Sequence, residues 1–343
     1  MNKLFRSLCI IVLCSIMALP AGCTAVKTQV VYSVYPIGYL LERLAGKTLR
    51  YQSIQEPLIV ERAQILDDYE DTLSQSQAYF HLGDLEPYLS VTASDVRASG
   101  VKVIDLSTMN AIYDFKRYME VPGKDELEFE ELPYYEGDMF STIDTTEQDL
   151  HLWVDPIAML SMGKDIEKWL VETYPDNKGL YEKHLNTLES DMINLDAQYQ
   201  NFSSQLSQKG NTIRFATMTA GFGNWQKTYG FQVYPIIMSK YGVLPNDEQL
   251  KAIEERLKQD NVQYIVYEPN MTDDMKVLFR KVQSDLDLKR IDLSNLSSLT
   301  EDQEEDGKDY LSLMYENLSI LQTLEAVPIT NKNTSMEEVQ QAE

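Results

Sequence analysis

The sequence predicts an α/β protein of two lobes, each with a mainly parallel sheet flanked by helices, joined by one long rigid linking helix. Short apolar runs of strand length alternate with helical segments in both halves of the chain, which is typical of parallel sheets. The chain has 343 residues, more than one compact core usually holds. A long, uninterrupted helical pattern separates the two halves. Together these observations favour two lobes over a single domain.

The first lobe is expected to span residues 29–174. Its first strand is the apolar run at 28–34, and the helix after it opens at Pro36 and closes at Gly46, two residue types that favour helix starts and ends. Two further runs of strand length follow, AYFHLG at 78–83 and VKVIDL at 101–106. Helical segments separate these runs, so we expect the strands to lie parallel in one sheet.

Residues 175–207 are predicted to form the linking helix, because no glycine follows Gly179 and no proline follows Pro175 in this range. Apolar side chains recur in alternating steps of four and three residues, which places them on one helical face. They are Tyr181, Leu185, Leu188, Met192, Leu195, Tyr199, Phe202 and Leu206. At 1.5 Å per residue the helix runs roughly 45 Å, the length of a domain. We expect it to lie along both lobes and to limit hinge bending; a coiled-coil segment is the alternative.

The second lobe is expected to span residues 208–326, ahead of a polar tail at 327–343. A helix is predicted at 246–260, with Asn246 or Asp247 as its N-cap and acidic residues in its first turn. Four apolar runs of strand length belong to this lobe, at 212–218, 232–237, 262–269 and 289–293. The lobe therefore repeats the α/β pattern of the first.

The N-terminus predicts an exported lipoprotein. Residues 1–22 carry two basic residues ahead of an apolar stretch that is typical of a signal peptide and too short for a permanent membrane span. The ending Pro-Ala-Gly-Cys resembles a bacterial lipobox, although Pro20 stands where leucine is usual. Lipidation at Cys23 would leave residues 23–28 as a tether on the outer face of the cell membrane. An ordinary secretory signal cut nearby is the alternative.

Cysteine usage and charge agree with this location. Two of the three cysteines lie inside the signal, so the mature chain keeps Cys23 alone and can form no internal disulfide. The full chain has 30 basic and 54 acidic residues, and loss of residues 1–22 removes two basic residues and no acid. The mature chain therefore has 28 basic and 54 acidic residues, a net charge of −26. Such a surface repels nucleic acid and anionic lipid headgroups and can attract cations.

Several motifs, in this order along the chain, resemble those of the substrate-binding lipoproteins of bacterial zinc and manganese ABC importers. They are YPIGYLLERLAG (35–46), GDLEPYL (83–89), DLHLWVDP (149–156), GFGNWQKTYGFQV (221–233), LPNDEQLKAIEERLKQDNVQYIVYEPNM (244–271) and DYLSLMYENLSIL (309–321). No single motif decides the resemblance, but their order does. It covers residues 29 to 325 and implies two lobes that clamp a ligand at their interface.

The resemblance implies a metal site with four ligands at the C-terminal ends of strands. His151, in the Trp-Asp-Pro motif, matches one ligand position, and Asp292 matches the C-terminal Asp ligand of the family. A neutral imidazole suits Zn²⁺ or Mn²⁺ when an oxygen acceptor holds its other ring nitrogen. From the residues alone, His151 could also be a packed structural residue, and Asp292 could cap the turn after its strand.

The other two ligand positions depart from the family pattern. No histidine occurs at 56–71, where the family has its first ligand, and Glu61 lies near that position. The third position holds Thr219, whose hydroxyl is a poor donor for either ion. Tight zinc binding needs about four N, S or charged O donors, whereas Mn²⁺ accepts oxygen donors and water. A site of Glu61, His151 and Asp292 would therefore suit Mn²⁺ better, and a non-metal solute is a further alternative.

The resemblance implies a function in solute import. We expect a monomeric lipoprotein that captures Zn²⁺ or Mn²⁺ between its lobes and delivers the ion to an ABC permease and its ATPase. The alternative is a surface interaction or adhesion protein that kept the scaffold and lost metal binding. An enzyme is not expected, because no Gly-x-Ser-x-Gly, phosphate loop or His-Glu-x-x-His occurs, and Glu86 and Glu268 match structural Glu-Pro strand ends.

Residues 120–149 are acidic and contain no histidine, whereas zinc binders of the family often carry a His-rich loop at this place. The segment is predicted to be a solvated loop, and weak gathering of divalent cations at the mouth of the cleft is the alternative. Of the remaining histidines, His81 is expected to pack at a strand end and His184 to face solvent.

Overall fold

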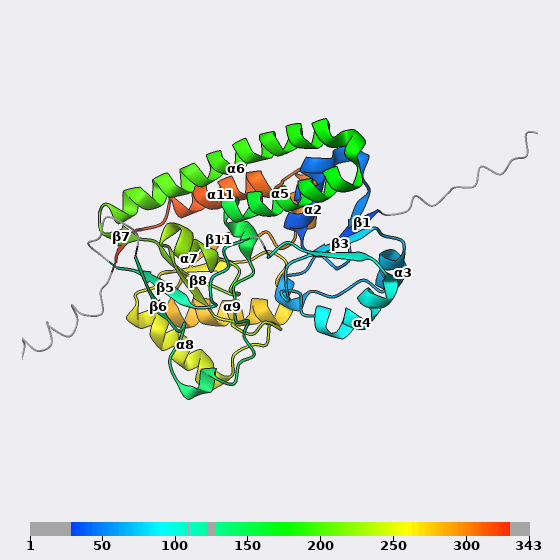
Figure 1. Ribbon diagram of the computed structural model, residues 1–343. Coiled ribbons are helices and arrows are strands. Elements are labelled where there is room, and N and C mark those ends of the chain that lie inside the picture. The colour runs from blue at the N-terminus through cyan, green and yellow to red at the C-terminus, as the bar shows by residue number, and fades with distance from the viewer. Residues whose placement is uncertain (1–28, 109, 122–127, 330–343) are drawn as a thin grey trace, which may run out of the picture.

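The computed structural model describes residues 29–108, 110–121 and 128–329. The predicted signal peptide, Cys23 and the tether lie outside the described residues, as does the tail beyond residue 329. Two four-stranded parallel sheets, one in each half of the chain, lie below a layer of helices (Figure 1). The predicted α/β fold, with two parallel sheets and one long helix, is confirmed.

The first sheet has the strand order β2-β1-β3-β4, and all its neighbours are parallel. Its strands and helices are β1 (Val30–Tyr32), α2 (Tyr35–Ala45), β2 (Tyr51–Ser53), α3 (Tyr69–Ser74), β3 (Ala78–His81), α4 (Leu89–Ser99) and β4 (Lys102–Asp105). The central strands β1 and β3 are apolar and almost fully buried, as expected of a sheet covered on both faces. The helix predicted after the first strand is α2, and Gly46 is its C-cap, with a φ of 53°.

The second sheet has the order β11-β10-β8-β9 and is also parallel. Its elements are β8 (Arg214–Thr217), α7 (Asn224–Tyr229), β9 (Gln232–Pro235), α8 (Asp247–Gln259), β10 (Tyr264–Tyr267), α9 (Asp273–Leu286), β11 (Lys289–Asp292), α10 (Glu301–Glu305) and α11 (Tyr310–Leu321). Each of the four predicted runs contains one strand. Asn246 is the N-cap of α8, where it forms a reciprocal capping box with Gln249.

The helical layer joins the two lobes. The long helix α6 (Lys178–Ser207) follows α5 (Pro156–Thr173) and the short turn η5 (Pro175–Asn177), and it lies along α2, α5 and α11 (Figure 1). All eight apolar positions predicted for this helix are buried or half-buried against one core. That core contains Val30 of the first sheet and Phe215 of the second. Since both lobes share it, the linking helix is part of a rigid connection.

Glycine brings α5 and α6 close together. A Cβ atom at Gly163 would lie 2.9 Å from Cδ2 of Leu188, which is closer than side-chain carbon atoms approach each other. A larger residue at position 163 would therefore require the buried Leu188 side chain or one of the two helices to shift.

The acidic segment at 120–149 differs from the predicted solvated loop. It overlaps an antiparallel hairpin of β5 (Arg117–Glu120) and β6 (Phe129–Leu132) and includes the turn η3 (Asp138–Phe140). Tyr134 and Tyr135 are buried in the core of the second lobe, and the Tyr135 hydroxyl donates to the carbonyl oxygen of Pro235 at 2.7 Å. The aromatic residues explain the packing, because they bury apolar area while the glutamates of β6 face solvent. Part of the range 29–174 therefore packs against the second lobe.

Three smaller features complete the fold. The strands β7 (Asn211–Thr212) and β12 (Val327–Pro328) pair antiparallel, so the range predicted as a polar tail begins in a strand. His184 is half-buried, and its Nδ1 lies 2.8 Å from the carbonyl oxygen of Leu44, in contrast to the solvent-facing position expected. Across 29–108, 110–121 and 128–329, no helix has both the length and the apolar character needed to cross a membrane.

Candidate functional site

Glu61 and His151, two of the predicted site residues, meet between the lobes. Glu61 lies in the short turn η2 (Val60–Arg62), and His151 directly precedes the turn η4 (Leu152–Val154). Both side chains are buried. The backbone around His151 rests against the second lobe, because Asn224 donates to the His151 carbonyl oxygen at 3.0 Å and the Trp153 indole donates to the carbonyl oxygen of Asn295 at 2.7 Å.

The His151 imidazole lies between two carboxylates. Its Nδ1 is 2.9 Å from Oδ1 of Asp149, which also accepts the backbone N–H of His151 at 3.0 Å. Its Nε2 is 3.5 Å from Oε1 of Glu61, too far for a good hydrogen bond. Nε2 of His151 and Oε2 of Glu61 are both buried without a hydrogen-bond partner. Metal-ligating histidines have this arrangement, in which one nitrogen is held by a carboxylate and the other is open.

The two carboxylates hold a positive charge at this point. Burial by itself lowers the pKa of His151, but the hydrogen bond with Asp149 and the adjacent Glu61 carboxylate raise it to about 10. The two carboxylates thus favour the protonated imidazole. A metal ion that binds Nε2 must replace this proton, since only the neutral ring is a ligand.

The site includes Asp149, which the sequence reasoning did not single out. A Cβ atom at Gly223 would lie 2.0 Å from Oδ2 of Asp149, so only glycine at this position leaves room for the carboxylate. Gly223, the second glycine of the Gly-Phe-Gly motif, immediately precedes α7. The close approach of Asp149 explains why this position is a glycine. The signal in the sequence was the Asp-x-His spacing, which lets the Asp149 carboxylate bond both the backbone N–H and the ring of His151.

Thr219 lies on the opposite wall of the site and is fully buried. Its backbone N–H and its hydroxyl both donate to the Glu268 carboxylate, each at 2.8 Å. The side-chain amide of Asn295 donates a third hydrogen bond to Glu268 at 2.9 Å. Burial raises the pKa of Glu268 to about 7, and the nearby charge of Glu61 adds to the effect. The Thr219 hydroxyl is thus engaged with an acid that the sequence reasoning treated as structural.

Asp292 does not join this cluster, in contrast to the expectation from the family pattern. It ends the edge strand β11, where side chains alternate between the core and solvent, so Ile291 is buried and Asp292 faces outward. The Asp292 side chain is 62% exposed and pairs with Arg290 of the same strand. It lines a surface pocket of about 370 Å³ together with Tyr267 and Lys276.

The protein therefore offers few direct donors to an ion. Within 29–108, 110–121 and 128–329, no three His, Cys, Asp or Glu side chains converge to hold a metal ion. Glu61 and Nε2 of His151 are the pair that faces one point. An ion bound there would complete its coordination with water, which Mn²⁺ tolerates better than Zn²⁺ does.

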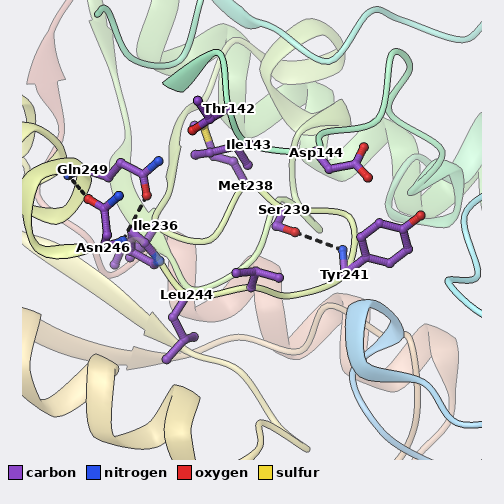
Figure 2. Close-up of a pocket in the computed structure, with 12 residues that line it drawn as sticks. Thr142, Ile143, Asp144, Ile236, Met238, Ser239, Tyr241, Leu244, Asn246 and Gln249 are labelled. Carbon is purple, nitrogen blue, oxygen red and sulfur yellow. Dashed lines mark hydrogen bonds between the residues drawn. The ribbon is translucent and has the colours of Figure 1, made fainter. Parts of the chain in front are cut away.

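A separate pocket of about 360 Å³ lies in the second lobe and contains none of the predicted site residues (Figure 2). The chain after β9, the start of α8 and the segment 142–144 form its walls. Its interior is mainly apolar, with Ile143, Ile236 and Leu244 among the lining residues, and Asp144 and Asn246 are among its polar ones. This composition does not suit a metal ion, so the candidate site remains the one around His151.

Known proteins resemble this chain over half of its length or more. The zinc-binding lipoprotein AdcA of Streptococcus pneumoniae (strain ATCC BAA-255 / R6) is 25% identical over 295 residues, which are 86% of this chain and 55% of AdcA. The high-affinity zinc uptake system protein ZnuA of Bacillus subtilis (strain 168) is 26% identical over 173 residues, 50% of this chain and 52% of that protein. The chain thus spans about half the length of the curated relatives that it matches.

A solved structure gives the same fold. The periplasmic zinc-binding protein TroA from Treponema pallidum superposes with a TM-score of 0.65 at 14% identity and covers 86% of this chain and 98% of TroA. This likeness supports the two-lobe fold, while the sequence match decides the family. The profile of the family described as zinc-uptake complex component A, periplasmic (ZnuA), matches residues 30–324, and the chain therefore belongs to this family.

Proposed function

We propose that the chain is the substrate-binding component of an ABC importer and captures a divalent metal ion, Zn²⁺ or Mn²⁺, between its lobes. One observation carries the proposal: Asp149 holds one nitrogen of His151, and the other nitrogen faces Glu61 with no hydrogen-bond partner. Membership of the zinc-uptake family supports the same function and favours it over adhesion. The ion is cargo, so reversible binding is what the site has to provide.

The site residues have distinct roles in this proposal. Asp149 accepts a hydrogen bond from Nδ1 of His151, so the ion binds at Nε2 and replaces the proton there. Glu61 supplies a negative charge on the other side of that point. Because both side chains are buried, their attraction for a cation is less weakened by water than on an open surface.

The balance of charge supports a cation as the ligand. Asp149, Glu61 and Glu268 bring three buried carboxyl groups to the two walls of the site, and among the described residues His151 is the basic group that pairs with them. In the part of the chain that the structure describes, neither lysine nor arginine forms an ion pair with these acids. Three buried carboxyl groups face a single imidazole, so a divalent cation would stabilise the site and an anion would not.

The donors indicate which ions to compare. One imidazole and one carboxylate, completed by water, fall short of the four-donor tetrahedral set of tight zinc sites. Mn²⁺ accepts carboxylate and water ligands. We therefore expect Mn²⁺ to bind at least as well as Zn²⁺, although the relatives of this chain are named for zinc.

The location and the partners belong to the same proposal. The lipobox-like sequence before Cys23 and the description of a relative as a lipoprotein support a lipid anchor on the outer face of the cell membrane. The importer would supply a permease and an ATPase, to which a monomeric binding protein delivers its ion.

A thermal melt tests the proposal. The mature chain with Cys23→Ser is stripped of metal and titrated with Zn²⁺ and with Mn²⁺. A ligand of the folded state at about a hundred times its Kd adds about 2.7 kcal/mol, which raises the Tm by a few degrees. The increase should disappear in His151→Ala and persist in the matched variant His184→Ala, whose histidine lies on α6. An unchanged Tm with both ions would contradict the proposal.

A further inference from the structure

The loop that carries Glu61, residues 56–64, is fixed at its base to the first lobe. The backbone N–H of Glu56 donates to the carbonyl oxygen of Gln64 at 2.9 Å, and Gln55 and Ile65 form an isolated antiparallel bridge. These contacts close the loop where it leaves the first sheet. The tip of the Glu61 loop is free to make other contacts.

Consecutive side chains at the tip point to different parts of the molecule. Ile59 is fully buried in the core of the second lobe, a cluster that also contains residues of β9, α8 and α9. Val60 is fully buried in the core that contains the first sheet. Glu61 faces His151. The tip is therefore inserted between the lobes, and Ile59 ties it to the lobe from which it does not come.

Arg62 makes a second tie to the other lobe. Its Nη2 donates to Oδ2 of Asp274 in the first turn of α9, at 3.0 Å. Its guanidinium also lies on the backbone of Gly242, where a Cβ atom would come within 2.7 Å of Nε. Gly242 has a φ of +63°, so glycine serves both the turn and the close approach of Arg62.

We propose that Ile59 and Arg62 are positioning residues that hold Glu61 against His151 by fastening the Glu61 loop to the second lobe. The inference rests on the proposed function only in that it makes Glu61 a ligand of the captured ion. The second lobe then acts on the site through Glu61, although within the described residues none of its His, Cys, Asp or Glu side chains joins Glu61 and His151 in a group that could hold a metal ion. A local shift of α9 or of the turn at Gly242 would draw Glu61 away from His151 and open the coordination of the ion.

The first test needs no metal. The N–H groups of residues 62 and 63 donate to the carbonyl oxygens of Ile59 and Val60, so their hydrogen exchange reports opening of the loop tip. We expect Arg62→Gln to speed this exchange about two- to fivefold, the range for loss of a partly exposed ion pair, and Arg62→Lys to restore part of the protection. The matched control is Lys164→Gln, which breaks an ion pair with Glu189 between α5 and α6.

The second test measures release of the ion. A chelator is mixed with the Mn²⁺-loaded protein, and the dissociation rate is followed in Arg62→Gln, in Asp274→Asn and in the double variant. Each single change should raise the dissociation rate about two- to fivefold, and the double variant should exceed neither by more than experimental error, because both break one contact. Lys164→Gln should leave the rate unchanged.

The two tests separate this inference from the proposed function. Exchange at residues 62 and 63 that is the same in wild type, Arg62→Gln and Lys164→Gln would overturn the positioning role, whether or not an ion binds. Faster exchange with an unchanged dissociation rate would also overturn it, since the loop would then open without affecting the ion. A wild-type protein that binds neither Zn²⁺ nor Mn²⁺ would contradict the proposed function, while the exchange test would still decide whether Arg62 fastens the loop.

Discussion

The two walls of the site differ in their chemistry. The wall from the first lobe presents charged groups, with His151 held between Asp149 and Glu61. The wall from the second lobe presents Thr219 and Asn295, two neutral residues that donate hydrogen bonds to Glu268. The resemblance to metal-binding relatives implied ligands from both lobes. In this chain Glu61 and His151, the pair that we propose to hold the ion, both come from the first lobe, and we propose that the second lobe positions Glu61.

The largest expected effect is on the affinity for Mn²⁺, and it compares a substitution in each wall. Glu61→Ala removes one of two facing protein donors and a buried charge, so we expect the affinity for Mn²⁺ to fall about a hundredfold or more. Thr219→Ala removes a hydroxyl that is engaged with Glu268, and the affinity should fall less than about tenfold. Competition against a fluorescent chelator measures both. Equal losses would mean that the second wall also contributes a ligand.

A buried acid of the first lobe gives the next effect, which concerns stability. Glu86 is fully buried, and burial raises its pKa from 4.5 to about 7. The folded protein therefore keeps this proton at pH values where the unfolded chain has lost it, so the contribution of Glu86 to stability falls as the pH rises from about 4.5 to 7. The shift corresponds to about 3 kcal/mol.

We expect Glu86→Gln to remove that part of the pH dependence, because an amide does not titrate in this range. Denaturant unfolding at pH 5 and at pH 8 measures it. Metal affinity serves as the control and should not change. If Glu86→Gln loses as much stability between pH 5 and pH 8 as the wild type does, Glu86 does not contribute to the pH dependence and is charged in the folded protein.

The third effect concerns the orientation of the His151 ring. Asp149→Asn keeps the shape of the side chain and removes its charge, so the Mn²⁺ affinity should fall about 10- to 100-fold, as is usual for groups that hold a metal-ligating histidine. Asp155→Asn is a matched control, since Asp155 lies six residues after Asp149 at the N-cap of α5, where asparagine is an equally good cap. If both variants bind equally well, Asp149 does not orient the ring.

The smallest effect is expected at Asp292. Because its side chain is exposed and pairs with Arg290, Asp292→Asn should change the Mn²⁺ affinity less than about twofold. Isothermal titration of the two proteins side by side is sensitive enough for this comparison. A tenfold loss would restore Asp292 to the ligand set and would mean that β11 moves when the ion binds.

Most helices and strands were predictable from the sequence, because the spacing of their apolar residues is a local pattern. The apolar runs became β1, β3, β4, β8, β9, β10 and β11, and the face of eight apolar residues became the buried face of α6. Strand β2 was not predicted, because its three residues are half-buried and give no apolar run. The β5–β6 hairpin was not predicted either, because the many acidic residues of its segment indicated a solvated loop, although Tyr134 and Tyr135 are buried.

The site was less predictable, since it depends on contacts between segments far apart in the chain. The sequence pattern pointed to Glu61 and His151, and the structure brings the two together. It also pointed to Asp292, but a strand-end acid faces the core or solvent according to its register, which the sequence does not reveal at an edge strand. Asp149 was missed because its role depends on Gly223, 74 residues later in the chain.

Anomalous diffraction from crystals grown with Mn²⁺ tests most directly whether an ion lies between His151 and Glu61. We expect a single strong peak within about 2.0–2.3 Å of Nε2 of His151 and of a Glu61 carboxylate oxygen, with water at the remaining positions and no ligand from Asp292. A peak at Asp292, at Glu268 without His151, or at no site in crystals that contain the ion in excess would contradict it.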